Sequence, residues 1–433
     1  MKLFAEGSDK QSRLAYTMEC AFEYHVALMV ADSFLAILLS ALGFSDAEVG
    51  VLSSLISLAF LFQLVAVPLA RKFRGAKPVS LLFHGFSRLP LFTLYLLPMM
   101  SMSEAGKRVT AVLCILLSYF CSYFVSPTMY KWGNSFVPLK ERGMFSATKE
   151  MISLATGLAV SLGAGVVMQR FTDKGDLYGG FLFASAAILV FSVLDMACIL
   201  LMRDRPQSEE AKKTPFREVL KNTLGNKAFL SVLLFSVLVN MASYNVVGFL
   251  GTYKVGELRI TLTMVQIINI IGAAGRMVLS RPFGRLTDRT SFLYAARISL
   301  LLVLSSFAVL IFTKPSTWWL MIVYVLLYNV AQAGLNANMT NITYSYVKED
   351  YFVEATAIKN SVGGLCGFGM SLLAGRFLSF VQGSGNRFMG LSVYGQQVLA
   401  AGSAVLTVCA ILVSLLLLKD KNSPLSHFQG TSL

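Results

Sequence analysis

Long apolar runs, repeated twelve times along the 433 residues, constrain this chain more than any other feature. A membrane-spanning helix needs about 20 consecutive apolar residues, whereas barrel strands alternate over about 10. These runs are continuous, so they predict helices that satisfy their own backbone hydrogen bonds in lipid. Charged residues make up only 14% of the chain, against roughly 25% in soluble domains. The runs lie near Thr17–Leu42, Ala47–Ala70, Pro78–Met100, Val109–Tyr130, Phe145–Met168, Gly179–Met202, Ala228–Thr252, Thr261–Ser280, Phe292–Phe312, Trp318–Tyr344, Ala355–Phe380 and Val398–Leu418.

The net charge of +14 comes from basic residues that cluster between the apolar runs. With the N-terminus placed inside, Lys and Arg gather in the inner segments and are sparse in the outer loops, as the positive-inside rule requires. The charge therefore indicates membrane topology rather than nucleic-acid binding. We expect a multi-pass protein of the cell membrane with both termini cytoplasmic.

One hydrophilic stretch divides the chain into two related halves. We expect an N-terminal six-helix bundle over residues 1–202, a cytoplasmic linker over 203–227, and a C-terminal six-helix bundle with a short cytoplasmic tail over 228–433. Lys140-Glu141 and Lys348-Glu349 are each followed, seven residues after the lysine, by an Ala-Thr pair. Both stretches lead into the fifth run of their half, which favours an internal duplication of the kind found in many transporters.

The stretch Gly284-Arg285-Leu286-Thr287-Asp288-Arg289 resembles the loop signature of the major facilitator superfamily of secondary transporters. The resemblance implies an all-α fold of twelve transmembrane helices in two pseudo-symmetric six-helix bundles. It also implies gating roles for Gly284, Arg285, Asp288 and Arg289, with topogenic charge as the alternative. The first-half copy of the signature is degraded, and the drug-antiporter signatures are poor. We therefore expect a secondary transporter of the symporter type, and keep a multidrug or metabolite efflux antiporter as the alternative.

Ionisable residues lie within the first, third and sixth runs, where an unpaired charge costs several kcal/mol. Glu23, Asp32 and His25 in the first run are candidates for coupling transport to protons, or to sodium. Arg88 and Asp195 are expected to form a structural ion pair, with Arg88–Asp32 as the other pairing considered. Glu19, four residues before Glu23 on the same helix face, is placed near the inner mouth and expected to be solvated.

Neutral polar residues recur at helical spacing in four later runs, most clearly in the tenth. A single Asn in a membrane helix is usually explained by helix–helix contact, but three amides on one face are harder to explain that way. Amides and tyrosines suit the binding of a small polar solute. The candidate substrate-binding residues are Asn240, Tyr244, Asn245, Gln266, Asn269, Tyr328, Asn329, Gln332 and Asn336.

Other functional classes find little support in the sequence. A polytopic membrane enzyme would need a catalytic motif, and the chain contains no HExxH sequence, nucleophile elbow or phosphate loop. The six cysteines form no CxxC pair and no Cys/His cluster with metal-site spacing, so neither a metal site nor a cofactor is expected. The expected partners are a small-molecule substrate and the lipid bilayer, for a protein that acts as a monomer.

Overall fold

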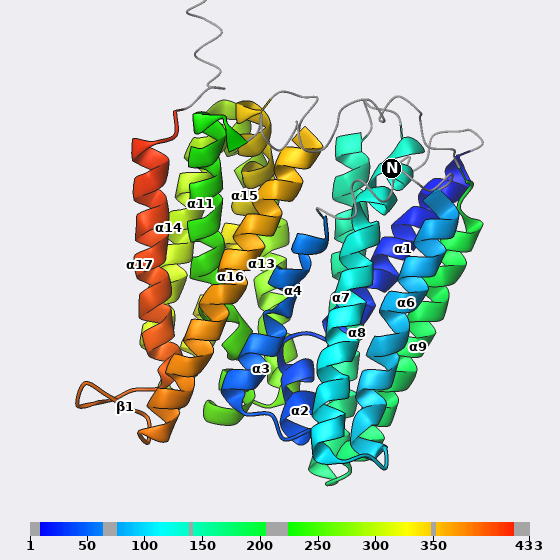
Figure 1. The fold of residues 1–433 in the computed structure, drawn as a ribbon, viewed down its shortest axis with the longest axis vertical. Coiled ribbons are helices and arrows are strands. Elements are labelled where there is room, and N and C mark those ends of the chain that lie inside the picture. The colour runs from blue at the N-terminus through cyan, green and yellow to red at the C-terminus, as the bar shows by residue number, and fades with distance from the viewer. Residues whose placement is uncertain (1–8, 64–75, 138–141, 205–223, 348–351, 420–433) are drawn as a thin grey trace, which may run out of the picture. The chain divides into compact units, whose positions relative to one another are not determined.

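The computed structural model describes residues 9–63, 76–137, 142–204, 224–347 and 352–419 (Figure 1). Within these residues, eleven helices are long and apolar enough to cross a membrane. A twelfth span is formed if the bent pair Lys10–Met29 and Asp32–Ala41 counts as one. The expected all-α membrane fold with twelve spans is therefore confirmed.

The helices of the described residues fall in two compact units. The first unit comprises Met1–Ser45, Phe62–Lys213 and Thr261–Gln266, and the second comprises Asp46–Leu61, Thr214–Ile260 and Ile267–Leu433. The expected linker over 203–227 lies largely outside the described residues, so the expected boundaries of the two bundles stay a prediction. The elements up to residue 201 are α1 (Lys10–Met29), α2 (Asp32–Ala41), α3 (Asp46–Ser53), α4 (Leu55–Ala59), α6 (Ala76–Leu96), η1 (Leu97–Met99), α7 (Glu104–Ser135), α8 (Arg142–Asp173) and α9 (Leu177–Leu201). The remaining elements are α11 (Lys227–Tyr244), η4 (Val247–Phe249), α12 (Leu250–Thr252), η5 (Tyr253–Glu257), α13 (Leu262–Arg289), α14 (Phe292–Ile311), η6 (Pro315–Thr317), α15 (Leu320–Tyr346), α16 (Phe352–Gly383), β1 (Arg387–Phe388), β2 (Leu391–Ser392) and α17 (Gly395–Leu416).

The two units repeat one packing scheme. In the first unit α6 packs against α7 and α9, while α1 packs against α8 and α9. In the second unit α14 packs against α15 and α17, while α11 packs against α16 and α17. The same neighbours therefore recur at equivalent places in the two sets of helices, which supports the internal duplication inferred from the sequence.

The first apolar run is broken in the structure, where a single helix over Thr17–Leu42 was expected. Val30 and Ala31 leave the helical conformation, and α1 and α2 meet at an angle of 44°. Asp32 adopts a positive φ of 49°, a backbone region that Asn and Asp tolerate better than most residues. It then stands in the first turn of α2, where a carboxylate is favoured by the helix dipole. Apolar residues continue on both sides of the break, so the sequence pattern did not predict it.

Glycines on α16 set how closely α4 approaches within the second unit. A Cβ on Gly364 would overlap the backbone oxygen of Ser57 in α4. A Cβ on Gly369, on the same helix, would meet nothing within 4 Å. Close packing therefore requires glycine at position 364 but not at position 369.

We predict that Gly364→Ala destabilises the purified protein by about 1–3 kcal/mol, because a backbone oxygen cannot rotate away as a side chain can. Gly369→Ala is the matched control on the same helix. It should leave thermal stability unchanged or raise it by up to about 1 kcal/mol through helix propensity. Thermal unfolding of both variants in one detergent checks this, and equal melting temperatures for the two variants would contradict the packing described here.

Candidate functional site

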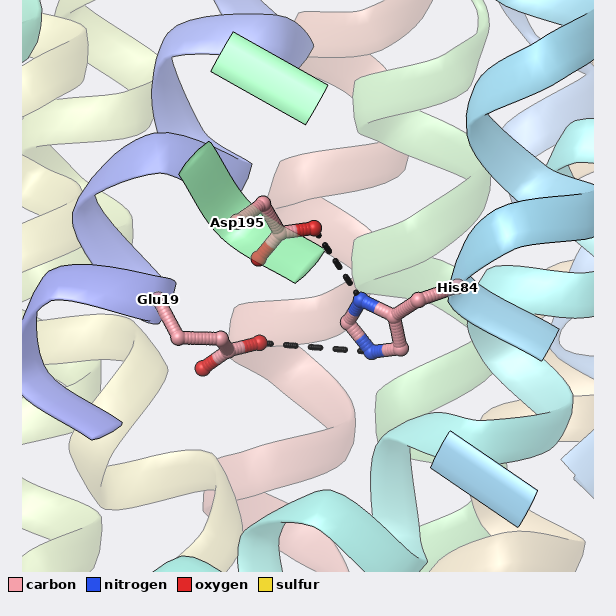
Figure 2. Close-up of side chains that lie close together, drawn as sticks. All are labelled: Glu19, His84 and Asp195. Atoms are coloured by element: carbon pink, nitrogen blue, oxygen red, sulfur yellow. Dashed lines mark hydrogen bonds and ion pairs between the residues drawn. The ribbon is translucent and has the colours of Figure 1, made fainter. Parts of the chain in front are cut away.

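A cluster of charged side chains joins α1, α6 and α9 within the first unit. Glu19 and Glu23 lie four residues apart on α1, as His84 and Arg88 do on α6, so each helix presents two groups on one face. The α9 residue Asp195 lies between the partners: its Oδ2 is 3.3 Å from His84 Nδ1 and 3.2 Å from Arg88 Nε. Figure 2 shows Asp195 at one ring nitrogen of His84 and Glu19 at the other, with Glu19 Oε1 3.9 Å from His84 Nε2.

Most of this cluster is closed to solvent. Asp195 is 0% exposed, Glu19 1%, His84 3% and Arg88 6%. Charges buried this deeply persist only when they are paired, because desolvation costs several kcal/mol for each ion. Glu23 differs, since its side chain is 42% exposed while its Oε1 lies 3.1 Å from Arg88 Nη2. The cluster thus has a closed end at Asp195 and an open end at Glu23.

The structure places the expected partners Arg88 and Asp195 in contact, and their purely structural role stays a prediction. Glu19 is not solvated as expected, because α6 and α9 cover it and leave it 1% exposed. Its importance could have been read from its spacing to Glu23, but its burial depends on helices that follow much later in the chain.

His25 and Asp32 contribute to other parts of the first unit than the Arg88–Asp195 ion pair. His25 is buried on α1, with Nε2 2.9 Å from Thr156 Oγ1 of α8. Its ring meets those of Phe22 and Phe191 edge-on, at centroid distances of 5.8 and 5.0 Å. Asp32 belongs to α2, beyond the bend. Of the three residues expected to couple transport to protons, only Glu23 thus takes part in an ion pair with Arg88.

The expected substrate-binding residues divide into an accessible and a packed group. Asn336 on α15 is exposed, and the other accessible members are half-buried. On α15 the Tyr328 hydroxyl donates to Ser243 Oγ of α11 at 3.3 Å, which brings the two helices together. The half-buried members are Asn240, Tyr244, Asn269, Tyr328, Asn329 and Gln332.

Asn245 and Gln266 belong to the packed group. Asn245 is 1% exposed, and its Nδ2 donates to the backbone oxygen of Leu399 at 2.7 Å and to Ser403 Oγ at 3.1 Å. Gln266 is 3% exposed and accepts a 2.5 Å hydrogen bond from Ser161 Oγ. Both amides hold neighbouring helices together, which is the ordinary use of such groups in membrane proteins.

Two polar residues that sequence analysis did not select are buried in the second unit. Asn338 on α15 donates to Thr287 Oγ1 of α13 at 3.1 Å and to the Gly334 backbone oxygen at 2.7 Å. Lys359 on α16 lies within the eleventh apolar run, is 4% exposed and donates to Thr343 Oγ1 at 3.0 Å. Its place in the run indicated a helix, but its partner on α15 could not be read from the sequence.

The expected gating stretch is helical rather than a loop. Gly284, Arg285, Asp288 and Arg289 form the last turns of α13, which ends at Arg289. Arg285 and Arg289 are exposed, and the side chain of Asp288 lies outside the described residues. A Cβ on Gly284 would meet nothing within 4 Å, so close packing does not require glycine there. Their gating role stays a prediction.

A family model described as the Major Facilitator Superfamily matches residues 20–371 and, separately, 233–432. Among solved structures, the nucleoside transporter NupG is similar, with a TM-score of 0.67 at 14% identity over 95% of this chain and 99% of that one. A bacterial homologue of the human lysosomal transporter Spinster has a TM-score of 0.65 at 15% identity, over 96% of this chain and 98% of that one. A structure titled as a bacterial metal transporter has a TM-score of 0.59 at 14% identity, over 94% and 98%. No curated protein sequence matches.

We predict that Arg88→Met lowers the stability of the protein by about 3–5 kcal/mol, because it leaves Asp195 buried with one cationic partner fewer. Glu23→Gln should cost no more than about 1 kcal/mol, since this carboxylate already meets solvent. Thermal unfolding in detergent compares the two variants. If Arg88→Met unfolds at the wild-type temperature, the ion pairs do not stabilise the first unit.

Proposed function

The chain belongs to the Major Facilitator Superfamily of membrane transporters, and we propose that it carries a small polar solute across the membrane by alternating access. The observation that supports this solute class is the accessible polar group on α11, α13 and α15. Its amides and phenols lie on helices that span the membrane, and they keep accessible surface although Asn240 and Asn329 each donate to the backbone of their own helix. Such groups bind hydroxyl- or amide-bearing molecules by hydrogen bonding and stacking.

The strongest support for a polar solute comes from the tenth span, α15. Asn329 and Gln332 are three residues apart and Asn336 follows four residues later, so the three amides recur along one side of α15. Tyr324 and Tyr328 stack on the same helix, with ring centroids 5.7 Å apart. Nucleosides and sugars combine hydroxyl groups with a surface on which an aromatic ring can stack. Because one structural neighbour is titled a nucleoside transporter, nucleosides are the first solutes to test.

We further propose that the protein acts as a monomer in the cell membrane with both termini cytoplasmic, and that it releases its solute unchanged rather than acting as an enzyme. Coupling to protons or sodium remains assigned to Glu23, Asp32 and His25. Export of metabolites or drugs would use the same accessible polar group, since direction depends on the gradients.

We predict that Asn329→Ala raises the KM for the transported solute about tenfold, as expected for one lost hydrogen bond of about 1.4 kcal/mol. Asn338→Ala is the matched control, because it removes the same side chain from the same helix at a packing position. It should lower the melting temperature and leave KM unchanged.

The measurement is counterflow of radiolabelled nucleosides, then sugars, in proteoliposomes containing the purified protein. Counterflow needs no knowledge of direction or coupling. Absence of counterflow for every hydroxyl- or amide-bearing solute in the panel would contradict the proposed solute class. Equal KM values for wild type and Asn329→Ala would show that Asn329 of α15 does not bind the solute.

Coupling is tested by Asp32→Asn, which keeps a residue that tolerates the positive φ and removes only the charge. We predict that accumulation driven by an imposed pH gradient is lost while counterflow is retained. Retention of gradient-driven accumulation would show that Asp32 does not couple transport to protons.

A further inference from the structure

The buried cluster on α1, α6 and α9 carries more negative than positive charge. Three carboxylates, Glu19, Glu23 and Asp195, face one guanidinium, that of Arg88, with His84 between them. Arg88 reaches Glu23 and only one oxygen of Asp195, its Oδ2. The other oxygen, Oδ1, is buried and has no hydrogen-bond partner among the described residues. A carboxylate oxygen without a partner in a 0% exposed residue calls for an explanation, and a nearby cation is one that fits its charge.

The orientation of His84 points to the kind of ligand. Its Nδ1 faces Asp195 Oδ2 at 3.3 Å, so an Nδ1–H that donates to this carboxylate leaves the lone pair on Nε2. Nε2 faces Glu19 Oε1 at 3.9 Å, which is too long for a hydrogen bond. Two ligand atoms about 2.1 Å from one ion can stand up to about 4.2 Å apart, so 3.9 Å suits a shared metal ion. A carboxylate that orients a histidine toward a metal is a recurrent arrangement in metal sites.

Glu19 presents the matching atom. Its Oε2 accepts a hydrogen bond from the Cys20 thiol at 3.2 Å, which leaves Oε1 directed at His84. One potential ligand atom from each of Glu19, His84 and Asp195 lies within 4.8 Å of the others. Three helices therefore bring one nitrogen and two carboxylate oxygens to one buried point.

We propose that this cluster binds one divalent metal ion of the zinc, manganese or iron(II) class. Glu19 Oε1 and His84 Nε2 are the direct ligands, and Asp195 accepts from His84 Nδ1–H and so orients the ring toward the ion. An imidazole beside a carboxylate suits these metals better than Ca²⁺ or Mg²⁺, which prefer oxygen alone, or Cu(I), which prefers sulfur. This site lies within the first unit and does not depend on the proposed solute or on transport.

The test is isothermal titration of the purified full-length protein in detergent, stripped of metal by a chelator, with ZnCl₂ and then MnCl₂. We expect one ion per chain. Glu19→Gln and His84→Gln should each weaken binding more than tenfold, since losing even an outer-shell partner costs about 10- to 100-fold. His25→Gln and Glu104→Gln are the matched controls, a buried histidine hydrogen-bonded to Thr156 and an exposed glutamate paired with Lys107, and they should bind as wild type does.

A second measurement on the unmodified protein keeps the test independent of how the variants fold. CoCl₂ should give a visible spectrum of nitrogen and oxygen ligation without a thiolate charge-transfer band. Absence of binding at millimolar metal would overturn the proposal. So would a thiolate band, or binding that Glu19→Gln and His84→Gln leave intact in folded protein.

Discussion

In the hydrocarbon region of a membrane, every polar group must find its partner inside the protein or in enclosed water. The first unit satisfies this constraint by helical spacing: residues four apart on α1 and on α6 bring four ionisable groups to one α9 carboxylate. In both units, basic side chains also donate hydrogen bonds to backbone oxygens at helix ends. Lys77 Nζ donates to the backbone oxygen of Leu200 at 2.6 Å, and Arg297 Nη2 donates to that of Ser414 at 2.5 Å. A basic residue of α6 or α14 thus satisfies carbonyls at the end of its packing partner, α9 or α17.

The two units use their polar residues differently. In the first unit the ionisable side chains of the cluster are buried and contact one another, apart from Glu23, which is partly exposed. In the second unit the accessible polar groups are neutral amides and phenols on α11, α13 and α15, beside one buried lysine, Lys359 of α16. Buried charge suits a fixed ion, whereas accessible amides suit a solute that must also leave. The duplication therefore kept the packing scheme of the helices and changed the chemistry that each copy carries.

The spans, the repeat and the helical spacing of Glu19 with Glu23 were readable from the sequence, because they depend on local periodicity. The bend before Asp32 was not, since apolar residues continue through it and only backbone dihedrals reveal it. The meeting of Glu19, His84 and Asp195 was not readable either, because it depends on three helices far apart in the chain. For the same reason, the absence of a local Cys/His motif said nothing about a metal site assembled by the fold. Lys359 lies inside the eleventh apolar run, but its burial against Thr343 depends on α15 and could not be read from the sequence.

The claim that the α15 amides meet water while other surfaces meet lipid is tested most directly by cysteine accessibility. Asn329→Cys, Gln332→Cys and Asn336→Cys would each be made in a chain without native cysteines and treated in membranes with a charged, water-soluble thiol reagent. Reaction requires a thiolate, which forms only where water reaches it. We expect labelling at these three positions and none at Val405→Cys, a 63% exposed position on an apolar stripe of α17. Unlabelled α15 positions, or equal labelling at Val405→Cys, would contradict this division between water-facing and lipid-facing surfaces.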